Sequence, residues 1–120
     1  MNVEPVTKAQ LQNLARVMGL ASDAVRVVLF GSAARGTMTA GSDLDFVLVI
    51  PDAQWNWQGS TLEKLEPTMR AREAARAAGY WMALDVLPLP ESRYGDSRSY
   101  LASEVKRDGV TLFEVGIVNA

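Results

Sequence analysis

Residues 25–50 read VRVVLFGSAARGTMTAGSDLDFVLVI, and the rest of the chain is best understood outward from this segment. It opens and closes with short runs of β-branched and apolar residues, 25–30 and 44–50, and each run predicts a buried strand. Between them lies a segment rich in glycine and hydroxyl residues, 31–41. Gly31 and Ser32 directly follow the first strand, where glycine lets the backbone approach an anion closely. Taken alone, the pair is also compatible with a tight turn leading into a capped helix.

Helices are predicted on both sides of this segment, where apolar residues recur at helical spacing over residues 7–18, 60–78 and 100–107. Thr7 and Gln10 fit a capping box at the first helix, and Gly19 is expected to end it. Pro67 leaves two possibilities for the second helix: a kink at the proline, or a main helix that begins there.

Two further strands are expected over residues 81–87, ended by Pro88, and 110–113, while residues 52–60 and 91–99 have the composition of loops. Strands that alternate with helices indicate an α/β (α+β) fold, a small mixed β-sheet flanked by helices. A length of 120 residues corresponds to one domain, so we expect a single domain over residues 1–120.

Composition excludes several classes of chemistry. The chain has no cysteine and no histidine, which excludes thiolate nucleophiles, zinc fingers and Ser-His-Asp triads. Its 12 basic and 14 acidic residues give a net charge of −2, which argues against direct nucleic-acid binding. The N-terminus has no signal-peptide pattern, and no apolar run approaches the ~20 residues of a membrane span. We therefore expect a cytoplasmic protein without a membrane partner.

The second strand has two distinct faces. Leu44, Phe46, Leu48 and Ile50 alternate with Asp43, Asp45, Val47 and Val49. The first set is expected to face the main core. The two valines predict that the aspartate face is also covered further along the strand.

Three aspartates are the candidate reactive groups. Asp43 and Asp45 share a face at the opening of the second strand, about 6.6 Å apart along it. Asp85 interrupts the apolar sequence ALDVL at residues 83–87. Alone, Asp85 could face solvent at a sheet edge or pair with Arg35. If the two strands are neighbours, however, all three carboxylates can converge, and such oxygen ligands suit Mg²⁺ beside substrate phosphates.

The glycine turn and the aspartates together describe one device for phosphoryl chemistry, which needs neither histidine nor cysteine. The Gly31-Ser32 turn would hold a triphosphate, and Asp43 and Asp45 would hold Mg²⁺ against it. Asp85 would complete a second metal position or accept the proton of the nucleophile.

The order of these residues resembles a known signature. Gly31-Ser32, ten residues and then Asp43-Leu44-Asp45 is similar to the Gly-Ser-x10-Asp-x-Asp pattern of the DNA polymerase β-like nucleotidyltransferase superfamily. The fuller pattern resembles its minimal nucleotidyltransferase branch through Gly31, Ser32, Arg35, Gly36, Ser42, Asp43 and Asp45, with Asp85 as the acidic residue on a later strand. The closing sequence SEVKRDGVTLFE, residues 103–114, is also similar to that branch, so the likeness runs from about residue 10 to 115.

The resemblance implies the polymerase β-like nucleotidyltransferase fold and the transfer of a nucleoside monophosphate, AMP from ATP, with two Mg²⁺ ions. It implies that Asp43, Asp45 and Asp85 are the catalytic and metal-binding residues. Gly31 and Ser32 would bind phosphate, with Arg35 and Ser42 as further nucleotide-binding candidates.

The resemblance also implies a partner. Proteins of this branch and size are commonly the antitoxin of a pair whose toxin is a HEPN-domain RNase, and some attach AMP to a tyrosine of that toxin, a type VII-like arrangement. Homo- or hetero-oligomers are compatible with this. Two alternatives stay open: a non-catalytic antitoxin that neutralises its partner by binding, and a stand-alone enzyme acting on a small molecule. Trp55 and Trp57 could anchor a partner or fold back over the core. Tyr94 and Tyr100 are weaker candidates for such contact.

Overall fold

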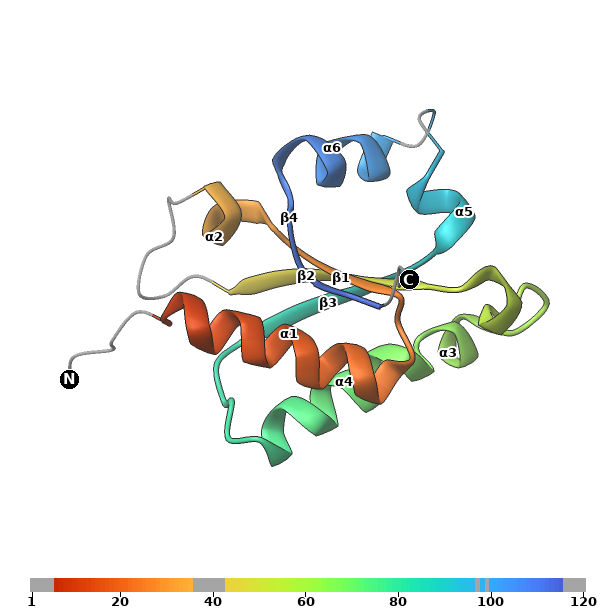
Figure 1. Ribbon diagram of the computed structural model, residues 1–120. Helices are drawn as coiled ribbons and strands as arrows, with labels where there is room; N and C mark the ends of the chain where they lie inside the picture. The colour runs from red at the N-terminus through yellow and green to blue at the C-terminus, as the bar shows by residue number, and fades with distance from the viewer. Residues whose placement is uncertain (1–5, 36–42, 97, 99, 116–120) are drawn as a thin grey trace.

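The computed structural model describes residues 6–35, 43–96, 98 and 100–115 (Figure 1). Its elements, in chain order, are α1 (Lys8–Ser22), β1 (Arg26–Phe30), α2 (Gly31–Arg35), β2 (Leu44–Ile50), the 3-10 helix η1 (Asp52–Gln54), α3 (Thr61–Lys64), α4 (Glu66–Ala77), β3 (Leu84–Pro90), α5 (Glu91–Tyr94), α6 (Tyr100–Asp108) and β4 (Val110–Glu114).

The strands form one mixed sheet in the order β3-β2-β1-β4. β1 pairs antiparallel with both β2 and β4, whereas β2 and β3 are parallel because the α3–α4 segment carries the chain from one to the other. The predicted small mixed sheet with flanking helices is therefore confirmed.

Helices cover both faces of this sheet. Figure 1 shows α1 and α4 side by side on one face and α5 and α6 on the other. The first face holds the larger core cluster, in which Leu44, Phe46, Leu48 and Ile50 of β2 meet α1 and α4. The second face holds a smaller cluster formed by Val28, Val47, Val49, Leu89, Tyr94 and Val105. The alternation read from residues 43–50 is thus confirmed on both faces.

The first helix begins as predicted and ends later than predicted. The capping box of Thr7 and Gln10 is present. Gly19 does not end the helix, which continues to Ser22, and Asp23 closes it in the left-handed conformation with φ 60°. Gly19 has a different role: a Cβ atom there would lie 2.4 Å from ring carbons of Phe113, so its missing side chain makes room for β4.

At Pro67 the sequence allowed either a kinked helix or a new helix, and the structure has a new helix. Ser60 caps the short α3 by accepting a hydrogen bond from the Glu63 N–H (3.2 Å). The main helix, α4, then starts at Glu66 with Pro67 in its first turn, where a missing N–H costs nothing.

The third strand lies three residues later than predicted, because Pro88 and Pro90 belong to it instead of ending it. The reason is its place at the edge of the sheet. Prolines two residues apart remove N–H groups on the same side of a strand, and an edge strand has one side without a partner.

The expected loop at residues 91–99 contains the short helix α5. Its cap is distant in sequence: the Ser92 N–H donates to Asp52 Oδ1 (3.0 Å). Tyr94 is buried, with Arg26 and Lys106 5.5 and 5.6 Å from its ring centroid, so the expectation that it contacts a partner is wrong. The side chain of Tyr100 lies outside the described residues.

The C-terminal elements agree with the prediction, with Val105 inward on α6 and β4 following Gly109. Arg26 of β1 pairs with Glu114, its register partner on β4. Burial alone would lower the pKa of Arg26, but its hydrogen bond with Tyr94 and the charge of Glu114 outweigh burial and raise that pKa.

Among the described residues, no helix has the length and apolar character to cross a membrane.

Candidate active site

One end of the sheet gathers the predicted reactive residues. β1 runs antiparallel to β2, and β3 runs parallel to it, so the end of β1 meets the starts of β2 and β3 (Figure 1). Asp45 lies between the other two strands, with Phe30 of β1 as its partner on one side and Asp85 of β3 on the other. Gly31 follows Phe30 directly. We call this end of the sheet the aspartate edge, defined by Gly31, Asp43, Asp45 and Asp85.

The aspartates face the same side of the sheet. Residues in register on adjacent strands present their side chains to the same face, so Asp45 and Asp85 do so. Asp43 lies two residues before Asp45 and continues that face, just ahead of the strand. Asp45 is half-buried, whereas Asp43 and Asp85 are exposed. The neighbouring strands that a convergence of carboxylates requires are therefore present.

Gly31 lies against the carboxylate of Asp45. Its φ of 76° is in the left-handed region that favours glycine. A Cβ atom at this position would lie 2.3 Å from Asp45 Oδ2. Backbone strain and lack of space thus both require glycine, and the turn from β1 into α2 presents bare backbone beside the carboxylate.

Among the described residues, apolar packing covers the aspartate face only part of the way along the strands. Further along the same face, Val47 and Val49 are covered by the smaller apolar cluster beneath α5 and α6. The starts of the two strands are joined by a hydrogen bond from the Leu44 N–H to the Ala83 carbonyl (3.0 Å). Asp43 and Asp85 are therefore exposed at a fixed strand end, whereas Asp45 is half-buried beside Phe30, which packs against that cluster.

Part of the predicted site cannot be placed. Ser42 lies outside the described residues, as do the side chains of Ser32 and Arg35, although the backbone of the latter two belongs to α2. The nucleotide-binding roles of these three residues stay predictions.

The donor chemistry of the aspartate edge fits a magnesium ion, because carboxylate oxygens are the ligands that Mg²⁺ prefers. Within the described part of the chain, Asp43 and Asp85 form no ion pair with a basic side chain. No three acidic side chains among these residues lie close enough together to hold a metal as they stand. A site with three carboxylate ligands is therefore not formed by the described residues, and the ligands of a metal at this edge stay a prediction.

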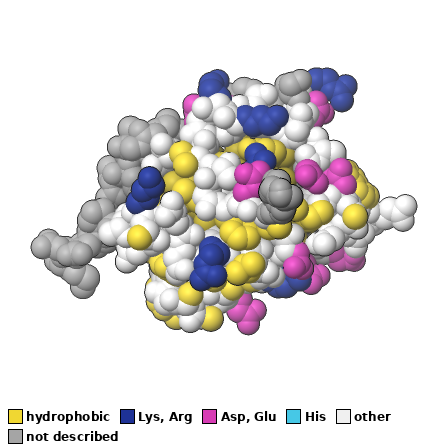
Figure 2. All heavy atoms as spheres, in the orientation of Figure 1, with side chains coloured by type: hydrophobic (Ala, Val, Ile, Leu, Met, Phe, Trp, Pro, Cys, Tyr) yellow, Lys and Arg dark blue, Asp and Glu magenta, His cyan; other side chains and the backbone are white. Residues whose placement is uncertain are grey.

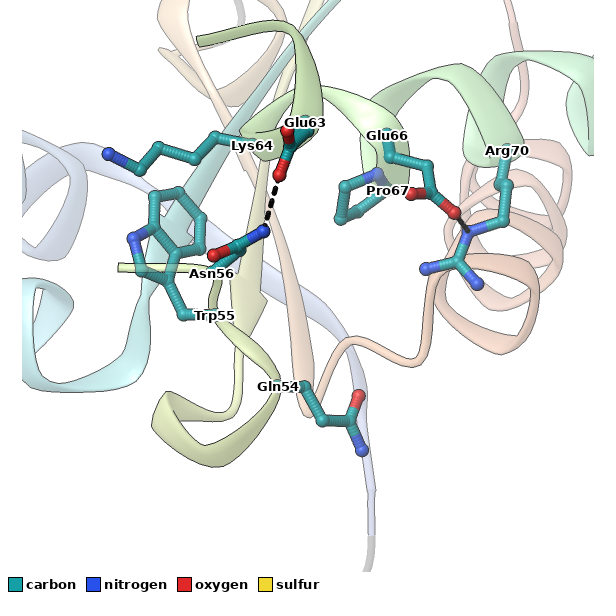
Figure 3. A pocket seen from close by; sticks show the side chains of 8 residues that line it. All are labelled: Gln54, Trp55, Asn56, Glu63, Lys64, Glu66, Pro67 and Arg70. Carbon is teal, nitrogen blue, oxygen red and sulfur yellow. Dashed lines mark hydrogen bonds and ion pairs between the residues drawn. The ribbon is translucent and has the colours of Figure 1, made fainter. Parts of the chain in front are cut away.

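Two cavities lined by described residues lie at the opposite end of the sheet. One of about 320 Å³ lies between the segment after β2 and the start of α4, with Trp55, Pro67 and Arg70 in its wall (Figure 3). Another of about 390 Å³ is lined by Arg26, Tyr94 and other residues near the start of β1. Neither includes a residue of the aspartate edge. The sequence singled out Trp55 in this region, as a possible partner anchor, and did not predict a cavity.

The two tryptophans of this region differ. Trp55 is half-buried against the main core, and its ring centroid lies 6.3 Å from that of Trp57 in an edge-on arrangement. Trp57 is 53% exposed and donates its indole N–H to the Asp52 carbonyl (3.3 Å). The core interpretation therefore holds for Trp55, and the surface interpretation holds for Trp57.

Comparisons with known proteins agree with this geometry. The family model described as nucleotidyltransferase domain matches residues 13–80, which include Gly31, Asp43 and Asp45 and end before Asp85. A search of the curated proteins finds no match.

Two solved structures are similar in fold. A toxin–antitoxin crystal structure with AMP-PNP has a TM-score of 0.56 at 18% identity, over 87% of this chain and 73% of that one. A protein of Sulfolobus solfataricus assigned to the nucleotidyltransferases has a TM-score of 0.50 at 18% identity, over 90% of this chain and 89% of that one. At this identity the likeness establishes the fold.

Proposed function

Because the chain belongs to the nucleotidyltransferase domain family, we propose that it transfers AMP from ATP to an acceptor protein in a Mg²⁺-dependent reaction. One observation carries this proposal: Asp45 lies between the side-chain-free turn at Gly31 and its in-register partner Asp85. Phosphoryl transfer has two requirements. One is a turn that admits the phosphate, and the other is a set of carboxylates that attract a divalent cation.

Each residue of the aspartate edge has a role in this proposal. Asp43 and Asp45 would hold the metal, which when bound neutralises charge on the phosphate oxygens. Gly31 leaves the backbone open to the triphosphate. Asp85, exposed beside Asp45, either adds a ligand or takes the proton of the acceptor.

The proposed reaction is a displacement at the α-phosphorus of ATP. The acceptor oxygen forms a bond to this phosphorus, the bond to the oxygen that bridges to the β-phosphate breaks, and pyrophosphate leaves. The proton of the acceptor hydroxyl passes to a carboxylate, for which Asp85 is the candidate.

The similarity to a toxin–antitoxin structure with AMP-PNP supports an adenine nucleotide as substrate and a toxin as acceptor. We propose that the acceptor is a tyrosine of a HEPN-domain toxin and that the chain acts as its antitoxin. An exposed edge suits this role, because a macromolecular acceptor must reach the phosphate.

A transfer assay tests the proposal. The purified chain is incubated with Mg²⁺, the HEPN-domain product of a neighbouring gene, and ATP labelled either in the α- or in the γ-phosphate. We expect label on the partner from α-labelled ATP alone, and none after chelation of the metal. Loss of a carboxylate in Asp45→Asn should slow transfer by about 10²–10³-fold, the range for removing one electrostatic stabiliser.

Glu91→Gln is the matched control, because Glu91 is an exposed carboxylate on α5, outside the aspartate edge. It should leave transfer unchanged. Equal rates for wild type and Asp45→Asn, or transfer of the γ-phosphate, would contradict the proposal. If a triple variant with Asn at positions 43, 45 and 85 still protects cells from the toxin, neutralisation occurs by binding.

A further inference from the structure

Trp81 is an exposed aromatic residue close to the aspartate edge. With 74% of its surface exposed, it is the most exposed large apolar residue in the described part of the chain. It lies in the connection from α4 to β3, two residues before Ala83, whose carbonyl accepts the hydrogen bond from Leu44. Two residues span at most about 7 Å, so the Trp81 backbone lies close to the strand ends that carry the aspartates. Its ring approaches Arg76 of α4, which covers the opposite face of the sheet.

Trp81 projects from a fixed base. The preceding residue, Tyr80, is half-buried against the main core, and its hydroxyl accepts a hydrogen bond from Asn13 Nδ2 of α1 (2.8 Å). On its other side, the Arg76 guanidinium lies 5.9 Å from the Trp81 ring centroid. Exposed tryptophans are enriched among the residues that anchor protein interfaces.

Three arginines without an ion-pair partner among the described residues lie on the helices next to the Trp81 connection. Arg72 and Arg76 are four residues apart on α4, so they lie on one face and repel each other. Arg16 of α1 reaches the same region through Asn13, to which it donates a hydrogen bond (3.4 Å). None of the three forms an ion pair with a carboxylate of the described residues, and Glu73, the nearest exposed acid on α4, lies beyond ion-pair distance.

Most other described arginines have an ion-pair partner: Arg26, Arg70, Arg98 and Arg107 each pair with a carboxylate, and Arg93 on α5 is the exception. Arg93 is alone on its helix, whereas Arg16, Arg72 and Arg76 lie on the two neighbouring helices α1 and α4 of a chain whose net charge is −2. Figure 2 shows hydrophobic side chains gathered over the end of α4 and its connection to β3, with a Lys or Arg side chain above them on α1.

We propose that Trp81, Arg16, Arg72 and Arg76, the Trp81 patch, dock an acidic segment of the acceptor protein on the α1–α4 face, at the end of the sheet that carries the aspartate edge. The three arginines supply the charge complement, and the indole supplies the anchor. The inference rests on the proposed function, since it assigns a binding surface to the acceptor of that reaction. A protein segment is favoured over nucleic acid because the net charge of the chain is negative.

The test measures binding without nucleotide or metal, so it is independent of catalysis. The probes are a fluorescent random copolymer of glutamate and tyrosine, a lysine–tyrosine copolymer of equal length, and a single-stranded oligonucleotide. We expect the acidic copolymer to bind at least about tenfold more tightly than the other two, and added salt to weaken it. Trp81→Ala and Arg76→Glu should each weaken it by about tenfold or more.

Matched controls lie elsewhere on the surface. Trp57→Ala removes the other well-exposed tryptophan, and Arg93→Glu reverses an exposed charge on α5; both should bind within about twofold of wild type. Trp81→Phe should retain most of the affinity, and circular dichroism establishes folding of each variant.

Three results would overturn the inference: no preference for the acidic copolymer, equal losses in the control variants, or tighter binding of the oligonucleotide with loss in Trp81→Ala. If the acidic copolymer binds through Trp81 while ATP is never transferred, the patch stands and the proposed reaction fails.

Discussion

At the scale of single residues, the aspartate edge depends on Gly31 having no side chain. The residue takes a left-handed conformation and lies against Asp45 Oδ2, so the turn and the carboxylate can occupy their places only together. A change at Gly31 should therefore affect both folding and the site.

Gly31→Ala should destabilise the protein more than Gly79→Ala. Both glycines have positive φ, 76° and 96°, and alanine in such a conformation costs about 1–2 kcal/mol. Only Gly31 also meets a neighbour, because nothing lies within 4 Å of a Cβ atom at Gly79. We expect a further loss of about 1–3 kcal/mol for overpacking, measured by urea unfolding.

The comparison cancels the effect of alanine on the unfolded chain, which is the same at both positions. Equal free energies of unfolding for the two variants would mean that Gly31 and Asp45 are not in contact. That outcome would remove the turn from the candidate site.

Several residue positions could be predicted from sequence, because strand alternation is a local property. It placed Asp43 and Asp45 on one face and Leu44 on the other. The exposure of Trp81 could not be predicted, since it depends on where α4 ends and β3 begins. The burial of Tyr94 likewise depends on Arg26 and Lys106, both distant in sequence.

At the scale of elements, the close approach of α1 and β4 explains why a glycine occurs inside a helix. Gly19 is buried, and the ring of Phe113 occupies the space that a side chain would need. Helix propensity alone favours alanine at this position by up to about 1 kcal/mol. Packing against β4 should reverse that preference.

Gly19→Ala should therefore destabilise the wild type by about 1–3 kcal/mol, because the Phe113 ring must move. In a Phe113→Ala background the same change should be neutral or stabilising by up to about 1 kcal/mol. A double-mutant cycle monitored by thermal unfolding measures the difference. If Gly19→Ala changes the stability in the same direction in both backgrounds, the contact with Phe113 is not the reason for glycine at position 19.

Elements with strong local signals were predicted best: the start of α1 through its capping box, and β2 through its alternation. Pro67 left two possibilities for the start of α4, and the structure has one of them. β3 was displaced, because a proline marks the end of a central strand but is tolerated at an edge. The position of an edge follows from the topology, which no local pattern contains. α5 was missed for a similar reason, since its cap comes from Asp52.

At the scale of the whole molecule, the mixed sheet assembles the aspartate edge by bringing the end of β1 to the starts of β2 and β3. Folding and ligand binding should therefore be linked, because the unfolded chain has no such edge. The cavities of about 320 and 390 Å³ lie at the other end of the sheet and include no residue of this edge.

Mg²⁺ and AMP-PNP together should raise the melting temperature. A ligand that binds only the native state adds about 2.7 kcal/mol at 100 times its Kd, which is roughly 10 °C for a domain of this size. Either ligand alone should have a smaller effect, and Asp45→Asn should abolish the joint shift. An equal shift in Asp45→Asn would place the ligand elsewhere.

The most direct test of the account is Mn²⁺ binding followed by electron paramagnetic resonance in the presence of AMP-PNP. Manganese replaces Mg²⁺ at oxygen sites, and its free signal reports the bound fraction without any need for turnover. We predict saturable binding by the wild type and by Glu91→Gln above that of AMP-PNP alone, and its loss in Asp45→Asn. Binding by Asp45→Asn as tight as that of the wild type would contradict the claim that the aspartate edge holds the metal.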